Sequence, residues 1–218
     1  MEFDFSLIIH SIPLLLRGAG LTLEITALAV GLGLLIGLVA SLAQLSKSPL
    51  LRLPAKVYVD CIRGTPLLIQ IFIIYFALPN IIGHRIDPFI AAVTACSLNS
   101  GAYIAEIFRG GIQGIPSGQY EAGQVLGMTK SQIFFKVTLL QVVKRILPPM
   151  GNEIITLVKD TSLANTIANK EIIMMAKEYS AKGLIWPLFS TALFFLVFVG
   201  ALTLLFNWAE KKLDYFRC

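Results

Sequence analysis

Two sets of polar side chains recur at helical spacing inside stretches that are otherwise apolar. Asn99, Tyr103 and Glu106 stand at i, i+4 and i+7, so they share one face of a helix. Glu153 and Asp160 are also seven residues apart. Carboxylates, amides and hydroxyls on such faces hold the polar groups of small ligands. We therefore take Asn99, Tyr103, Glu153 and Asp160 as candidates for one binding site or pathway.

Structural roles are open for the same side chains. Glu106 with Arg109, and Lys159 with a neighbouring carboxylate, are charge pairs of the kind that lock helices together. Asn99 is equally suited to a packing hydrogen bond between helices. The sequence alone leaves both interpretations open.

Familiar catalytic constellations are missing from the sequence. It has no Ser-His-Asp arrangement, no cluster with metal-ligand spacing and no Gly-x-x-x-x-Gly-Lys-Ser/Thr loop to cradle phosphates. Its cysteines, Cys61, Cys96 and Cys218, are widely separated and form no disulfide framework. We expect no catalytic residue, no metal site and no cofactor in this chain.

The elements that position the polar residues are apolar. Of the 218 residues 56% are hydrophobic and 14% are charged, whereas soluble proteins have about 25% charged residues. Runs that can cross about 30 Å of hydrocarbon predict an all-α integral membrane protein with five transmembrane helices in one domain, residues 1–218. The expected spans are Leu21–Leu45, Val57–Leu78, Pro88–Ala105, Ile146–Ala168 and Gly183–Ala209.

Two of these spans have special features. Gly33 and Gly37 in the first span form a small-x-x-x-small pair that lets another helix pack closely. Pro148 and Pro149 predict an interruption of the fourth span, and broken helices at membrane depth are tolerated where they line a cavity.

The distribution of basic residues predicts the orientation of the chain. With the N-terminus outside and the C-terminus in the cytoplasm, eleven lysines and arginines lie inside and four outside, as the positive-inside rule requires. The inner residues are Lys47, Arg52, Lys56, Arg109, Lys130, Lys136, Lys144, Arg145, Lys211, Lys212 and Arg217, and the outer ones are Arg85, Lys170, Lys177 and Lys182.

Residues 109–145 form the longest inner segment, and their glycines make a spanning helix implausible there. Ser117 is placed to cap a short helix over residues 118–126, which Gly127 then ends. Thr129 followed by Gln132 fits a capping box for the next helix. We predict a short helix between two turns on the cytoplasmic side.

In this segment the sequence resembles the EAA motif of binding-protein-dependent ABC importer permeases, which is Glu-Ala-Ala, three residues, Gly, nine residues and Ile-x-Leu-Pro. The chain has Glu121-Ala122-Gly123, then Gly127, then Val137-Thr138-Leu139-Leu140, with Gly123 and Leu140 departing from the pattern. Three more passages resemble the polar amino-acid branch of that family: Arg63-Gly64-Thr65-Pro66-Leu67-Leu68-x-Gln70, Leu98-Asn99-Ser100-x-Ala102-Tyr103-x-x-Glu106-x-x-Arg109, and Leu147-Pro148-Pro149-x-x-Asn152-Glu153 leading to Lys159-Asp160-Thr161-Ser162-Leu163.

The resemblance implies a type I ABC importer permease in a bacterial inner membrane, with the short helix docked on a separate ATPase. Glu121, Ala122 and Gly127 would serve that contact. Implied partners are two ATPase copies, a second permease chain of the same or a similar kind, and an extracytoplasmic solute-binding protein. Transport would proceed by alternating access. The passages resemble glutamine-type permeases, although basic amino acids and cystine use similar subunits.

Two functions from other classes compete with this interpretation. A stand-alone secondary transporter would use Glu153 and Asp160 as ion or proton sites, but five spans without an inverted repeat count against it. A membrane-embedded enzyme would need clustered His, Asp or Ser at one membrane surface, and the sequence lacks such a cluster. Copurification of an ATPase subunit discriminates among the three.

Overall fold

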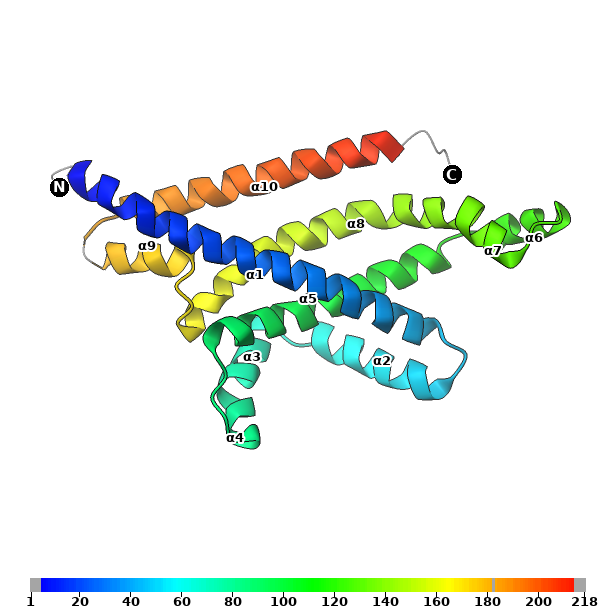
Figure 1. Cartoon of the computed structure of the whole chain (residues 1–218), viewed down its shortest axis with the longest axis horizontal. Coiled ribbons are helices and arrows are strands. Elements are labelled where there is room, and N and C mark those ends of the chain that lie inside the picture. Colours follow the sequence, from blue (N-terminus) through cyan, green and yellow to red (C-terminus); the bar gives the residue numbers. More distant parts are fainter. Residues whose placement is uncertain (1–4, 182, 214–218) are drawn as a thin grey trace.

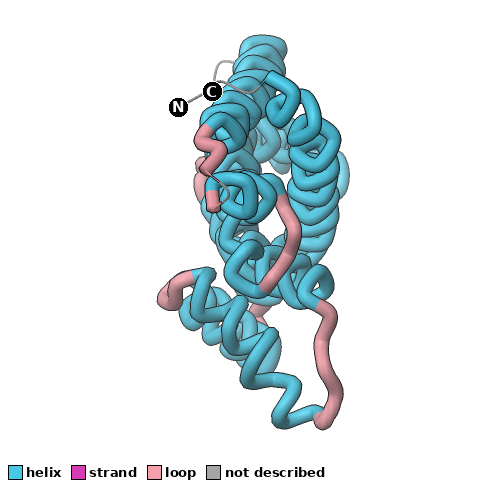
Figure 2. The backbone as a smooth tube through the Cα atoms, turned by 90° about the vertical axis from the view of Figure 1, so that its left-hand side faces the viewer, coloured by secondary structure: helices cyan, strands magenta, loops and turns pink. Residues whose placement is uncertain are grey.

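The computed structural model describes residues 5–181 and 183–213, and within these ranges every regular element is a helix; short loops join the helices that do not follow one another directly (Figure 2). Two π-helical turns, Ile73–Ala77 and Phe134–Thr138, and a 3₁₀ segment, Thr161–Ile167, interrupt the α-helices. The α-helices are α1 Phe5–Leu45, α2 Pro49–Arg63, α3 Leu67–Phe72, α4 Leu78–Ile82, α5 Pro88–Gln113, α6 Ser117–Val125, α7 Lys130–Ile133, α8 Leu139–Asp160, α9 Ile172–Ser180 and α10 Trp186–Leu213.

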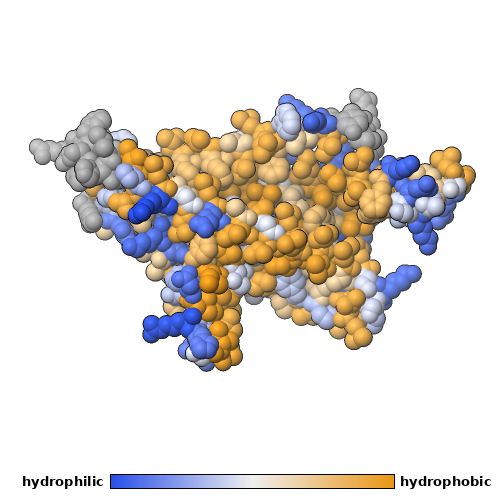
Figure 3. Space-filling model, in the orientation of Figure 1, coloured by the Kyte–Doolittle hydropathy of each residue, from blue (hydrophilic) through white to orange (hydrophobic). Residues whose placement is uncertain are grey.

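The long helices α1, α5, α8 and α10 extend along the length of the molecule (Figure 1). Residues 12–45 of α1, α5 and α10 are each long and apolar enough to cross a membrane, and α2 with α3–α4 makes a fourth candidate if the bent pair is one span. α8 differs in composition because charged residues interrupt it. Apolar residues cover the middle of the visible face and hydrophilic ones gather towards its ends (Figure 3). The predicted all-α membrane fold is confirmed.

The first span begins earlier than expected, because α1 continues through Gly18 and Gly20. A Cβ on Gly18 would lie 2.8 Å from the Cα of Ile172 in α9. This close approach explains a glycine inside a helix, where it otherwise costs about 1 kcal/mol relative to alanine. Packing against α9 therefore allows α1 to continue through Gly18 and Gly20, which in the sequence resemble a helix boundary.

Close packing of α1 on α5 forms the centre of the fold. A Cβ on Gly37 would lie 2.5 Å from Cγ2 of Ile104, and one on Gly101 would lie 2.8 Å from Cγ2 of Ile36. Gly33 likewise faces Ser100. The prediction that Gly33 and Gly37 admit a neighbouring helix is confirmed.

The predicted second span, Val57–Leu78, is wrong as a single straight helix. Its residues are divided between α2 and α3–α4, which meet at 107° across residues 64–66. Pro66 accounts for part of the break because it disfavours helical geometry at Thr65. A Cβ on Gly64 would lie 2.9 Å from the carbonyl oxygen of Asp60, so the turn also favours glycine there.

The predicted interruption of the fourth span at Pro148 and Pro149 is also wrong. α8 continues through both prolines to Asp160, and the chain then passes into the 3₁₀ segment. Each proline removes one backbone hydrogen-bond donor, but packing against neighbouring helices maintains prolines inside membrane helices. Here α10 supplies such packing, since a Cβ on Gly151 would lie 2.9 Å from the Phe206 ring.

Candidate functional site

Gln70 fixes the bend between α2 and α3. Its amide nitrogen donates to the carbonyl oxygens of Ile62 at 2.8 Å and Thr65 at 3.0 Å. Its amide oxygen accepts from Nδ2 of Asn99 at 3.0 Å, and both side chains are buried. One side chain thus joins the two arms of the bend to each other and to α5. Asn99 packs α5 on α3 rather than facing α8.

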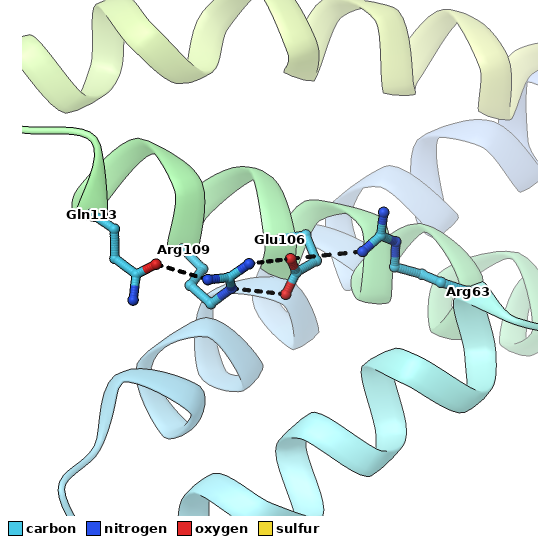
Figure 4. Close-up of polar contacts among 4 residues, drawn as sticks. All are labelled: Arg63, Glu106, Arg109 and Gln113. Atoms are coloured by element: carbon cyan, nitrogen blue, oxygen red, sulfur yellow. Dashed lines mark hydrogen bonds and ion pairs between the residues drawn. The ribbon is translucent and has the colours of Figure 1, made fainter.

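Glu106 lies at the centre of a charged network in the C-terminal half of α5 (Figure 4). Arg109 donates from Nε to Oε1 at 2.9 Å and from Nη2 to Oε2 at 2.5 Å, and its Nη1 donates to Gln113 at 2.7 Å. From α2, Nη1 of Arg63 lies 3.6 Å from Oε2 of Glu106. The alternative that Glu106 and Arg109 form a structural charge pair is confirmed, and the pair extends to the end of α2.

Tyr103 contacts Arg63 rather than a residue of α8. The guanidinium carbon of Arg63 lies 5.2 Å from the centre of the Tyr103 ring, within the range of a cation–π contact. Arg63 is the last residue of α2, where the helix dipole favours a cation. The side chains predicted on one face of α5 therefore contact the bent second segment.

The polar face of α8 meets a different side of α5. Glu153 lies near Ser100, whose hydroxyl has no hydrogen-bond partner among the described residues, and Asp160 lies near Cys96, one helical turn away from Ser100. Both carboxylates are partly buried. Asn99 and Tyr103 contact Gln70 and Arg63 of the second segment, so no direct contact between the two predicted polar faces is found among the described residues.

Arg63 connects the two polar regions. Besides its contacts with Tyr103 and Glu106, it has a minor electrostatic interaction with Glu153 of α8. Sequence reasoning quoted Arg63 only as part of a motif and assigned it no role. The signal in the sequence was a basic residue, Arg63, within the second expected span of a chain that also has a pair of intramembrane carboxylates.

Lys159 forms no ion pair with Glu153 or Asp160 in the described part of the chain, and its side chain is exposed. Thr156 and Asn152 are exposed as well. The alternative of a structural Lys159 ion pair is therefore not found. The polar face of α8 is open in this chain, with Glu153 and Asp160 at its inner edge.

The short helix α6 covers Ser117–Val125, within one residue of the predicted 118–126. Gly127 ends the turn with φ of 72°, and the predicted capping box of Thr129 and Gln132 is present. The predicted cap by Ser117 is wrong, because Pro116 is the N-cap residue and no side chain caps the helix.

Exposed residues on α6 and its turn form a surface suited to a partner. Glu121 and Ala122 are exposed, as are Val125 at 87% and Leu126 at 78%. A pair of apolar side chains this exposed on a short polar helix is typical of a contact surface. Sequence reasoning missed Val125 and Leu126, although they directly precede Gly127.

Three contacts hold α6 and the turn before it in place. A Cβ on Gly123 would lie 2.6 Å from Cγ1 of Ile133, so this departure from the EAA pattern lets α6 pack on the start of the next helix. Gln141 of α8 donates to Gln119 at 3.4 Å. Arg145 of α8 donates to the carbonyl oxygen of Gly114, in the turn between α5 and α6.

No group of His, Cys, Asp or Glu side chains within residues 5–181 and 183–213 could hold a metal ion. The groups that the site offers are carboxylates, the guanidiniums of Arg63 and Arg109, and neutral polar side chains.

An apolar helical bundle with a polar interior face and an exposed short helix at one end is the architecture of a transporter's membrane subunit. Residues 29–215 match the family model of the binding-protein-dependent transport system inner membrane component, and the chain belongs to this family. Its members are ABC transporter permeases and not enzymes; ATP is hydrolysed by a separate subunit.

Similar proteins include the glutamine transport system permease protein GlnP of Escherichia coli strain K12, which is 40% identical over 98% of this chain and 99% of its own length. The arginine transport system permease protein ArtQ of Bacillus subtilis strain 168 is 38% identical, covering 98% of each chain. The L-cystine transport system permease protein TcyB of the same strain is 40% identical over 93% of this chain and 87% of its own.

A solved structure described as an amino acid ABC transporter with histidines matches with a TM-score of 0.88 and 36% identity, covering 97% of this chain and 100% of the other. The MetNI methionine ABC transporter in an inward-facing conformation shares the fold, with a TM-score of 0.76, 21% identity and coverage of 92% and 96%.

Proposed function

We propose that this chain is the permease of an ATP-driven amino-acid importer of the glutamine type. Support for an amino-acid substrate comes from relatives named for glutamine, arginine and cystine. Support from the site comes from the two carboxylates of α8, Glu153 and Asp160, together with the guanidinium of Arg63, which has a minor electrostatic interaction with Glu153. A zwitterion needs both signs of charge, and an apolar surrounding strengthens each interaction.

In this proposal Glu153 and Asp160 line the substrate path and hold the ligand's ammonium group. Tyr103 lines the same path through its contact with Arg63. Asn99 is buried and hydrogen-bonded to Gln70, so it supports the helices that form the wall of this path. Binding basic amino acids or cystine would use the same positions, because all of these ligands share the amino-acid head group.

The transport cycle we propose is alternating access in a permease dimer with two ATPase copies and an extracytoplasmic binding protein. Glu121, Ala122 and Gly127 contribute the coupling contact on α6. Because α6 is attached to both α5 and α8, its displacement moves the two helices that carry Glu106 and Glu153. Packed helices transmit such a displacement because they move as rigid bodies.

The observation that carries the proposal is this attachment of an exposed helix to both helices of the polar site. The experiment is uptake into proteoliposomes that contain the permease, its ATPase and its binding protein, measured against a panel of radiolabelled amino acids. We expect ATP-dependent uptake of one polar amino acid or a small group of them. Uptake driven by an ion gradient without ATP would instead establish a secondary transporter.

A further inference from the structure

We propose that Arg63 binds the α-carboxylate of the transported amino acid, an inference that rests on the proposed function. The proposal starts from the N–H donors of the Arg63 guanidinium and how few of them are used in hydrogen bonds. An arginine side chain has five N–H donors and no acceptor. Its nearest carboxylate oxygen, Oε2 of Glu106, is 3.6 Å away. That separation is an ion pair without a hydrogen bond, so the donors of Arg63 are not used by the described residues.

Glu106 does not need Arg63 for its own stabilisation. Both of its oxygens already accept hydrogen bonds from Arg109, at 2.9 and 2.5 Å. A carboxylate satisfied in this bidentate way gains little from a second guanidinium at a longer distance. Arg63 is therefore held near Glu106 while its donors remain available for another anion.

The position of Arg63 is nevertheless well defined. The Tyr103 ring lies under the guanidinium at 5.2 Å, and Gln70 fixes the peptide carbonyl of Ile62 directly before it. The close-up shows the side chain rising from the end of α2 along α5, towards the side on which α8 passes (Figure 4). Such preorganisation reduces the entropy lost when a ligand binds.

Opposite charges stand across from this guanidinium. The side chain of Arg63 is 41% exposed, so a solute can reach it, and its charge acts on Glu153, which also interacts with Asp160. An amino acid between them would direct its carboxylate to Arg63 and its ammonium to Glu153. A planar guanidinium matches a carboxylate with two parallel hydrogen bonds, which lysine cannot do.

The test compares an amino acid with its carboxamide, which has the same shape but lacks the negative charge. Binding of L-glutamine and L-glutaminamide, and of L-arginine and L-argininamide, is measured by titration calorimetry on the purified permease–ATPase complex without binding protein. We expect the wild-type complex to prefer the acid by roughly tenfold or more, the range of a charge-assisted hydrogen bond. Arg63→Gln should reduce this preference to about one, and Arg63→Lys should restore part of it.

Arg109→Gln is the matched control, since it removes a guanidinium that contacts the same Glu106. It should retain the preference for the acid even if it lowers stability, because Arg109 is directed towards Gln113. An unchanged preference in Arg63→Gln, an equal loss in Arg109→Gln, or no preference in the wild type would each overturn the proposal. So would absence of binding by a wild-type complex that still takes up amino acid, whereas absence of ATP-dependent uptake would contradict the proposed function itself.

Discussion

At the scale of single residues, Glu153 and Asp160 have no cation at ion-pair distance in the described part of the chain. Lys159, the nearest candidate in the sequence, is exposed. A carboxylate retained in an apolar helix without a structural partner is a functional candidate by default. The two side chains therefore have a clearer role in ligand binding than in holding helices together.

We predict that Asp160→Asn lowers uptake roughly tenfold, the usual scale for losing a charge-assisted hydrogen bond, while Tm stays near that of the wild type. The amide keeps the shape of the side chain and removes only its charge. Loss of that charge strands no buried cation, because Lys159 is exposed and forms no ion pair with Asp160 among the described residues. Uptake and melting temperature should be measured on the same purified complex.

Glu178→Gln is the control for this acid-to-amide change, because Glu178 is exposed on α9 away from the site. It should affect neither measurement. If Asp160→Asn instead lowered Tm and left uptake per folded complex unaltered, Asp160 would be a structural residue and not a pathway residue.

At the scale of elements, the bend between α2 and α3 depends on one amide. We predict that Gln70→Leu lowers the free energy of unfolding by about 1–3 kcal/mol, the cost of leaving buried polar groups unpaired. The variant keeps the volume but leaves Asn99 and the carbonyl oxygens of Ile62 and Thr65 without this partner. Chemical denaturation in detergent checks the value.

Asn80→Leu serves for comparison, since Asn80 donates to Phe76 from an exposed position. Its effect should be within about 0.5 kcal/mol, as for most surface changes. Equal effects of the two substitutions would show that Gln70 has no special role in fixing the bend.

Coupling to the ATPase is assigned to α6 and its terminal turn. We predict that Glu121→Lys and Gly127→Leu leave the permease inserted but reduce ATPase association and substrate-stimulated hydrolysis several-fold. The first reverses a charge on an exposed face. The second places a side chain at φ of 72°, which costs about 1–2 kcal/mol, and adds volume at the contact.

Gly118→Ala provides the control on the same helix, because a Cβ there would meet nothing within 4 Å. Copurification of the ATPase and its hydrolysis rate are the two measurements. Wild-type values for both Glu121→Lys and Gly127→Leu would remove the coupling assignment.

Some of these elements could be predicted from the sequence and others could not, for physical reasons. α6 and the capping box were predictable because helix ends depend on local signals such as Pro116, Gly127 and Thr129. The 107° bend lies inside an apolar run, and hydropathy does not distinguish a straight span from two helices that meet at a turn. Which side of α5 faces α2 and α3 depends on how the helices rotate against each other, so the contacts of Asn99 with Gln70 and of Tyr103 with Arg63 could not be derived from spacing.

At the scale of the whole molecule, the polar site and the coupling surface belong to one continuous framework. α5 carries Glu106 and leads directly into the turn before α6, while α8 carries Glu153 and returns to α6 through Gln141 and Arg145. A displacement of α6 therefore acts on both walls of the site at once. In the proposed transport cycle, this arrangement would let a separate ATPase act on the polar site through α6.

The arrangement in space also supports the predicted orientation in the membrane. α6 and α7 lie at the same end of the molecule as the C-terminal end of α10, whereas α9 lies at the other end beside the beginning of α1 (Figure 1). We predict that a cysteine at Met128 or Lys211 is labelled by an impermeant maleimide only in inverted vesicles, and one at Lys177 only in intact cells. Each cysteine is introduced into a chain in which the native Cys61, Cys96 and Cys218 have been replaced.

Because the inner segments carry eleven basic residues against four in the outer ones, reversal would place most of the positive charge on the external side, contrary to the positive-inside rule. Lys211 tests the same side even where an ATPase covers Met128, so labelling of both positions from outside the cell would show that the chain has the opposite orientation.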